Sequence, residues 1–183
     1  MKRTILFFTI IGLIGVRGEA GEIKGKWGLG VRVVPISYSS TISVLRGISS
    51  RTALLGLISF SIHHRDINSY WYSTISTGIG GEWRRYTRPE NRISPYFGMG
   101  PSFGLTRSRS SSFNRLEWNA GLGFNFGAEY HVNEYLSLSS HLPLLGYTFT
   151  NGKIEYSNGD EDREKLHDFH FLINPSLIFR LYF

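Results

Sequence analysis

The chain has 183 residues, a formal net charge of +6, 15% aromatic residues and no cysteine. This length is enough for one domain with a filled interior, and the lack of cysteine excludes disulfides and thiolate metal sites. Charged residues make up only 19% of the chain, which together with the aromatic content argues against intrinsic disorder.

Residues 1–20 predict a cleavable secretory signal peptide. Lys2 and Arg3 provide a basic start, an apolar run follows over 4–16, and the small residue Ala20 precedes the expected cleavage site. The apolar run is short for a membrane-spanning helix, and a short membrane anchor is the alternative interpretation. Removal of this segment lowers the formal charge from +6 to +4. The remaining basic residues are spread over the chain, so no nucleic-acid partner is expected.

Beyond the signal peptide, apolar residues alternate with small or polar ones, which is typical of β-strands. The longest alternation, over 116–130, exceeds the usual length of a strand in a soluble sheet and suits a tilted strand that crosses a bilayer. A bulge is expected at Pro143, where one alternation loses phase. In chain order, the pattern predicts strands over 27–33, 36–45, 52–62, 71–85, 94–105, 116–130, 135–149 and 167–183.

The connections between these strands differ in length on the two sides. The short ones are GISSR (47–51), TRPEN (87–91) and HVNE (131–134). The segments 106–115 and 151–165 are longer and polar, 63–69 is intermediate, and the first connection, near Val34 and Pro35, is tight. An even number of strands with short turns at one end and longer loops at the other is typical of outer-membrane barrels.

The face opposite the apolar one decides between two all-β architectures. A soluble sandwich would expose that face to water, and Lys and Glu would be frequent on it. It carries Gly, Ser, Thr and Asn instead, which fit the narrow interior of an eight-stranded barrel. We therefore predict that 21–183 form one domain, an eight-stranded antiparallel up-and-down transmembrane β-barrel with its apolar face toward lipid.

The last stretch, FHFLINPSLIFRLYF over 169–183, alternates in the same way and ends on Phe183. It resembles the C-terminal strand of bacterial outer-membrane proteins. The whole pattern resembles small outer-membrane β-barrels of the OmpA-barrel, OmpX and opacity-protein kind. The resemblance implies a monomer in the cell outer membrane, in contact with its lipid and lipopolysaccharide. It also implies that the barrel-assembly machinery recognises the strand that ends at Phe183.

Aromatic residues near the predicted strand ends are expected to form two belts at the membrane interfaces. Trp27, Trp83, Tyr86 and Tyr130 lie toward the short turns, and Tyr70, Trp71 and Trp118 lie toward the longer loops.

Charged residues on the polar faces are expected to form ion pairs inside the lumen, because charges in a narrow barrel must be paired or hydrated. They are Arg32, Glu82, Arg84, Glu117, Glu129, His141, Asp168, His170 and Arg180. A gated pore is the alternative use of these residues, although eight strands leave little open channel.

No metal or cofactor site is expected. His63 and His64 alternate faces, as do His167 and His170. Only Asp168 shares a face with His170, and two ligands do not make a metal site.

The catalytic alternative is a lipid A-modifying enzyme of the deacylase kind. Such a site needs a serine, a histidine and an acid placed together, and Ser139 and His141 share a face that Glu117 or Glu129 could approach. Serine is so frequent in this chain that a match of this kind arises by chance. No catalytic residue is therefore expected.

The expected role is structural, or one of surface interaction through the extracellular loops. Arg107, Arg109 and Arg115 make one loop basic, while Asp160, Glu161 and Asp162 make the last loop acidic. The candidate binding partners of these loops are lipopolysaccharide and a cell-surface partner.

Overall fold

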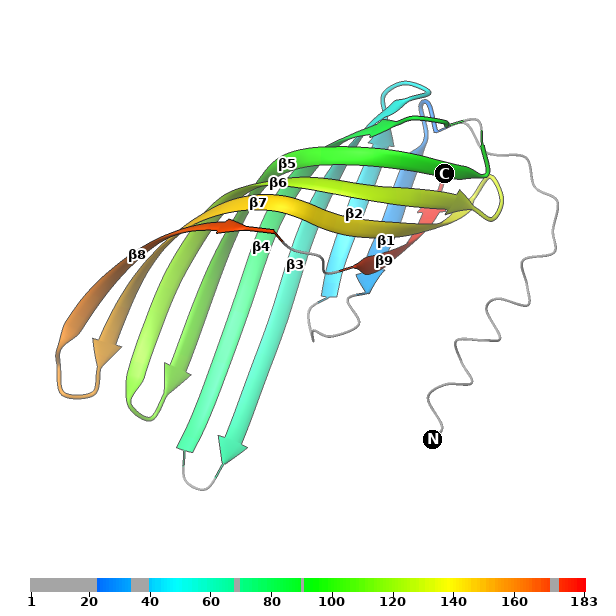
Figure 1. Ribbon diagram of the computed structural model, residues 1–183. Coiled ribbons are helices and arrows are strands. Elements are labelled where there is room, and N and C mark those ends of the chain that lie inside the picture. The colour runs from blue at the N-terminus through cyan, green and yellow to red at the C-terminus, as the bar shows by residue number, and fades with distance from the viewer. Residues whose placement is uncertain (1–22, 34–39, 68–69, 90, 172–174) are drawn as a thin grey trace.

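The computed structural model describes residues 23–33, 40–67, 70–89, 91–171 and 175–183. These residues form a single antiparallel sheet of nine strands (Figure 1). In chain order they are β1 (Trp27–Val33), β2 (Ser40–Gly47), β3 (Thr52–Ile67), β4 (Tyr70–Tyr86), β5 (Ile93–Ser110), β6 (Phe113–His131), β7 (Leu136–Tyr156), β8 (Glu161–His170) and β9 (Ser176–Tyr182). Within the described residues, no helix is long and apolar enough to cross a membrane.

The sheet closes into a ring through β9. Strands β1 to β7 pair in chain order, and β9 pairs with β1 on one side and with the first part of β7 on the other. Strand β8 pairs with the second part of β7, so β8 and β9 follow one another along the same edge of β7. The fold is therefore the predicted eight-stranded up-and-down barrel, with its eighth strand divided in two.

The two ends of the barrel differ, as expected. The predicted short turns at 47–51, 87–91 and 131–134 lie at one end, which we call the turn end. At the other, the hairpin end, the prediction of long loops at 106–115 and 151–165 is wrong, because paired strands occupy most of both segments. A polar sequence shows that a segment meets water, but it does not stop backbone hydrogen bonding between neighbouring strands.

The apolar faces of the strands point away from the lumen, which confirms the central prediction. Ile58, Ile79 and Leu181 are 63%, 62% and 58% exposed, whereas inward-facing Ser137 and Ser139 are buried. Contiguous apolar surface of this extent suits lipid rather than water, and a dry core made of these side chains is excluded. The bulge expected near Pro143 is confirmed by a register shift between Phe124 and Asn125 of β6 against β7.

Two predictions lie outside the described residues. They are the signal peptide over 1–20 and the first connection, near 34–35.

Candidate functional site in the barrel lumen

Large side chains fill the turn end of the lumen. Arg84, Arg180, Tyr86 and Tyr96 are among the largest fully buried residues. They fit because glycines face them: a Cβ at Gly127 would lie 2.5 Å from the Tyr96 ring. The prediction of small residues in the lumen is therefore correct for one side of each contact. A large side chain lies on the other side.

Tyr86 does not belong to an interfacial belt, contrary to the prediction. It lies two residues after Arg84 on β4 and therefore points into the lumen, where it is 1% exposed. Trp27 is 45% exposed, in agreement with the predicted belt.

Glu129 of β6 is the centre of the first buried network. Its carboxylate accepts hydrogen bonds from Tyr86 Oη at 2.7 Å, Tyr182 Oη at 2.6 Å and Arg180 Nη1 at 2.8 Å. The Ser137 hydroxyl donates a further bond. A buried carboxylate with this many donors and a paired guanidinium has its charge compensated, so the network is a stable part of the interior.

A second buried network surrounds Glu82 of β4. Arg84 Nε donates to Glu82 Oε1 at 2.6 Å, and Asn125 Nδ2 donates to Glu82 Oε2 at 3.2 Å. The Arg84 guanidinium also lies 4.3 Å from the centre of the Tyr96 ring, which is a cation–π contact. Together the two networks occupy the cross-section of the lumen at the turn end, and we call them the lumenal plug.

The candidate deacylase residues are only partly brought together. The Tyr96 hydroxyl lies 3.2 Å from Ser139 Oγ and 3.3 Å from His141 Nδ1, so a tyrosine stands where the serine and histidine would meet. Glu129 is engaged in its own network, and Glu117 pairs with Arg115 at 2.8 Å. The carboxylate of Glu82, which was not predicted for this role, lies 4.0 Å from His141 Nδ1.

Of the other residues predicted to form ion pairs in the lumen, Asp168, His170 and Glu117 have partners, whereas Arg32 pairs with no carboxylate among the described residues. Asp168 Oδ2 lies 3.3 Å from His170 Nδ1 on β8, and Arg115 bridges Glu117 and Glu164. His167 lies on the opposite face of β8 from His170, and its Nδ1 forms a hydrogen bond of 2.7 Å with Tyr147 Oη. Within the described residues, no group of three or more His, Asp or Glu side chains is arranged to hold a metal ion.

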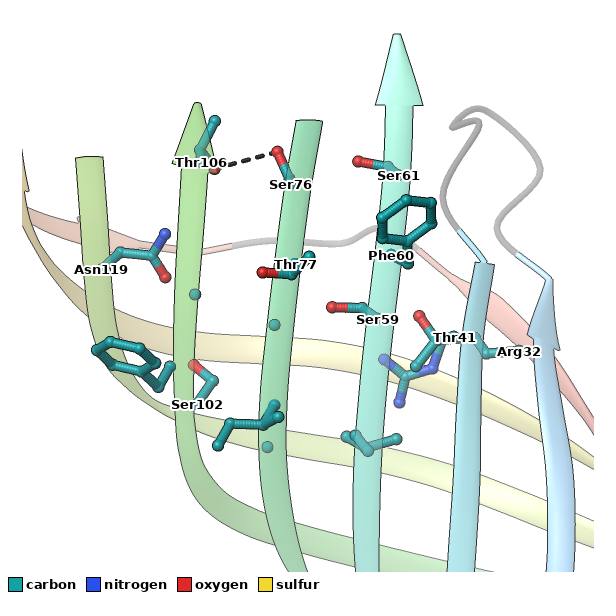
Figure 2. A pocket seen from close by; sticks show the side chains of 16 residues that line it. Arg32, Thr41, Ser59, Phe60, Ser61, Ser76, Thr77, Ser102, Thr106 and Asn119 are labelled. Carbon is teal, nitrogen blue, oxygen red and sulfur yellow. Dashed lines mark hydrogen bonds between the residues drawn. The ribbon is translucent and has the colours of Figure 1, made fainter. Parts of the chain in front are cut away.

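Beyond the plug, toward the hairpin end, the lumen contains a polar chamber of about 340 Å³. Figure 2 shows its side chains converging from neighbouring strands, with Arg32 beside Thr41 and Ser59. The inward-facing polar residues of the chamber are Arg32, Thr41, Ser59, Ser61, Ser76, Ser102, Thr106 and Asn119. Apart from Arg32, none of these residues was predicted as a site residue, although each occupies a polar position of an alternating strand.

On the outside of the barrel, cations lie at the edge of the apolar belt. Ile75, Arg107, Leu116, Lys153 and Arg163 are successive cross-strand partners from β4 to β8 and form one outward-facing row. We call Arg107, Lys153 and Arg163, with the adjacent outward-facing Arg109 and Lys165, the outer basic band.

One cation of the outer basic band is already paired. Lys153 Nζ donates to Glu155 Oε1 at 2.9 Å and to Glu161 Oε1 at 2.7 Å. Glu155 lies beyond the apolar belt, and the hydrogen bond and charge of Lys153 lower the pKa of its carboxyl. The carboxylate of Glu155 is therefore charged at neutral pH and occupied by Lys153.

The closed ring, the outward apolar belt and the filled interior define the class of this fold, a small transmembrane β-barrel of the outer-membrane type. Solved structures with this fold include a major outer membrane protein from Thermus thermophilus, with 14% sequence identity and a TM-score of 0.50 over 86% of this chain and 96% of that chain. Neisserial surface protein A is similar at 14% identity and a TM-score of 0.50, over 86% of this chain and 94% of that chain. No protein-family model and no curated protein matches the sequence. At these identities the likeness establishes the fold.

Proposed function

We propose that this protein is an integral, non-catalytic protein of the outer membrane that binds anionic lipopolysaccharide through the outer basic band. The observation that carries the proposal is the position of these cations, on the lipid-facing side and directly at the edge of the apolar belt. In the proposed orientation the turn end faces the periplasm and the hairpin end faces the exterior.

Arg107 illustrates the geometry. Its cross-strand partners are Ile75 and Leu116, both exposed apolar residues that belong to the belt. A long cationic side chain at such a border can lay its aliphatic stem on apolar surface and place its guanidinium among headgroups. The phosphates of lipopolysaccharide lie at this height in the outer leaflet, and arginine is well suited to bind them.

Most of the band is available for binding. Among the described residues, no carboxylate forms an ion pair with Arg107, Arg109, Arg163 or Lys165. The band covers only β5 to β8, since the corresponding outward positions of β3 carry His64 and Asp66. We therefore expect lipopolysaccharide to bind one side of the barrel rather than all around it.

Assembly through the C-terminal strand is part of the same proposal. Phe183 N donates to Trp27 O at 2.9 Å and Trp27 N donates to Phe183 O at 3.0 Å, so the last residue takes part in closing the ring. The Phe183 side chain is 75% exposed and points outward, where the assembly machinery can reach it before closure. Because the ring closes within one chain, we propose a monomer.

The proposal is tested by removing charge from the band. The triple variant Arg107→Ser, Arg163→Ser, Lys165→Ser is compared with Arg65→Ser, which removes an exposed cation from the lumen-facing side of β3. Lipopolysaccharide retained per barrel is measured by phosphate assay after extraction in mild detergent. Each cation near an anionic surface contributes about 1 kcal/mol, so the triple variant should retain only a small fraction of it.

Heat-modifiable gel mobility of outer-membrane fractions tests barrel closure and location in the same samples. Arg65→Ser should retain the wild-type amount of lipopolysaccharide. If the folded triple variant also retains that amount, the band is not the binding surface.

A further inference from the structure

We propose that the polar chamber binds a small ligand carrying a phosphate ester on a glycerol- or sugar-sized body, with Arg32 as the phosphate-binding residue. This site lies inside the barrel and is separate from the outer basic band, so the two proposals can fail independently.

Arg32 offers two adjacent donors with no protein acceptor. Its Nε and Nη2 atoms are buried and form no hydrogen bond. Both nitrogens are also closed to solvent, so a ligand in the chamber meets the remaining, chamber-lining part of the guanidinium. An arginine without a carboxylate partner binds phosphate oxygens through such N–H groups.

The charge balance below the chamber also favours an anion. Glu129 pairs with Arg180 and Glu82 pairs with Arg84, so both carboxylates of the lumenal plug are committed. Among the described residues, no carboxylate forms an ion pair with Arg32. The guanidinium of Arg32 therefore leaves one positive charge without a partner at the floor of the chamber, close to a low-dielectric protein wall.

The walls of the chamber supply the remaining hydrogen-bonding groups. Thr106 Oγ1 donates to Ser76 Oγ at 3.1 Å, but the hydroxyls of Thr41, Ser59 and Ser102 have no hydrogen-bond partner among the described residues. Hydroxyls both donate and accept, so they suit phosphate oxygens and ligand hydroxyls equally.

Glycines keep this space open. A Cβ at Gly78 would lie 2.7 Å from Ser59 Oγ, and one at Gly104 would lie 2.9 Å from Asn119 Oδ1. Any larger residue at either position would push a polar group out of the chamber.

The volume decides the size of the ligand. The chamber volume of about 340 Å³ is at the lower end of the range for small-molecule sites. This volume is larger than a bare phosphate needs and too small for a complete lipid. A free phosphorylated polyol or the headgroup of a phospholipid has the same chemistry and would fit.

Isothermal titration calorimetry on the refolded full barrel in detergent tests the site. Glycerol 3-phosphate, inorganic phosphate and glycerol are titrated into wild type, Arg32→Gln and the control Arg51→Gln, which removes an exposed cation from a short turn at the turn end, outside both the chamber and the outer basic band. Wild type should bind glycerol 3-phosphate and not glycerol. A charge-assisted bond contributes about 1.5–3 kcal/mol, so Arg32→Gln should weaken binding by at least about tenfold and Arg51→Gln should leave it unchanged.

Two further samples make the result decisive. Ser59→Leu fills the chamber without altering Arg32 and should also abolish binding, while heat-modifiable mobility verifies that every variant is folded. Micelles doped with phosphatidylglycerol distinguish a lipid headgroup from a soluble ligand, because binding only there assigns the phosphate to lipid. The proposal is overturned if Arg32→Gln binds as wild type does, or if no phosphate ester binds at concentrations up to about 10 mM.

Discussion

Glu129 of β6 and Arg180 of β9 form a fully buried ion pair with a distance of 2.8 Å between Oε1 and Nη1. The pair reaches across β7, because Ser137 is the cross-strand partner of Arg180 and also donates a hydrogen bond to Glu129. The ion pair therefore links β9, which closes the ring, to β6, which lies on the other side of β7.

Glu129→Gln should destabilise the barrel by about 3–5 kcal/mol, because it leaves the Arg180 guanidinium buried without a compensating charge. Urea unfolding followed by tryptophan fluorescence measures this loss. Glu155→Gln, which removes an exposed carboxylate at the hairpin end, is the matched control and should change stability by less than about 1 kcal/mol. Equal stability of the two variants would show that the buried pair contributes no more than a surface pair.

Gly127→Ala should be far more disruptive than Gly123→Ala on the same strand and face. A Cβ at Gly127 would lie 2.3 Å from the Ser140 carbonyl oxygen and 2.5 Å from the Tyr96 ring, whereas one at Gly123 would meet only Leu145 O at 3.9 Å. Overpacking of this kind costs about 1–3 kcal/mol or more. Unfolding midpoints in urea should show a large decrease for Gly127→Ala alone, and similar midpoints for both variants would contradict the packing described for Tyr96.

The wild-type barrel should not conduct ions in planar bilayers. The lumenal plug fills the turn end with Arg84, Tyr86 and Tyr96, which are buried at 0–1% exposure. A Tyr86→Ala, Tyr96→Ala double variant that still shows heat-modifiable mobility should conduct in small steps. Discrete conductance steps from wild type would support the narrow-pore alternative instead.

Lipid A composition should be the same in cells that express wild type and His141→Ala. Ser139 and His141 are 0% and 2% exposed, and the Tyr96 hydroxyl lies between them, so an ester of a lipid has no access to the serine. Mass spectrometry of extracted lipid A checks this outcome. If an acyl chain that is removed with wild type persists with folded His141→Ala, the non-catalytic role is wrong.

Phe183→Ala should slow assembly in cells without weakening the finished barrel. The backbone of residue 183 makes the ring-closing bonds to Trp27, and these do not depend on the exposed side chain. The amount of folded barrel in the outer membrane should decrease, while the unfolding free energy of refolded protein should change by less than about 1 kcal/mol. Phe179→Ala, on the same strand and face, is the control, and an equal assembly defect would show that the terminal position has no special role.

The number of strands and the faces of their residues could be predicted because both depend on a period of two along the chain. Tyr86 lies two residues after Arg84 and therefore points into the lumen as Arg84 does. The prediction of Tyr86 in an interfacial belt was wrong because it used only the aromatic side chain and its position near a strand end. Pro175, which lacks an N–H group, lies between β8 and β9.

The contents of the lumen were harder to predict. The alternation along each strand predicts which charged residues face inward. The pairing of Glu129 with Arg180 depends instead on strand register across β7. Register also decides that Gly127, Tyr96 and Ser139 meet, and that Arg32 keeps two donors without acceptors. The chamber is therefore a property of the assembled ring and not of any single strand.

Ring closure by β9 is restricted to the turn end, and among the described residues the second edge of β8 pairs with no other strand. The circumference at the turn end is thus fixed by a complete set of interstrand backbone hydrogen bonds. The base of the barrel, which encloses the lumenal plug, therefore keeps its diameter.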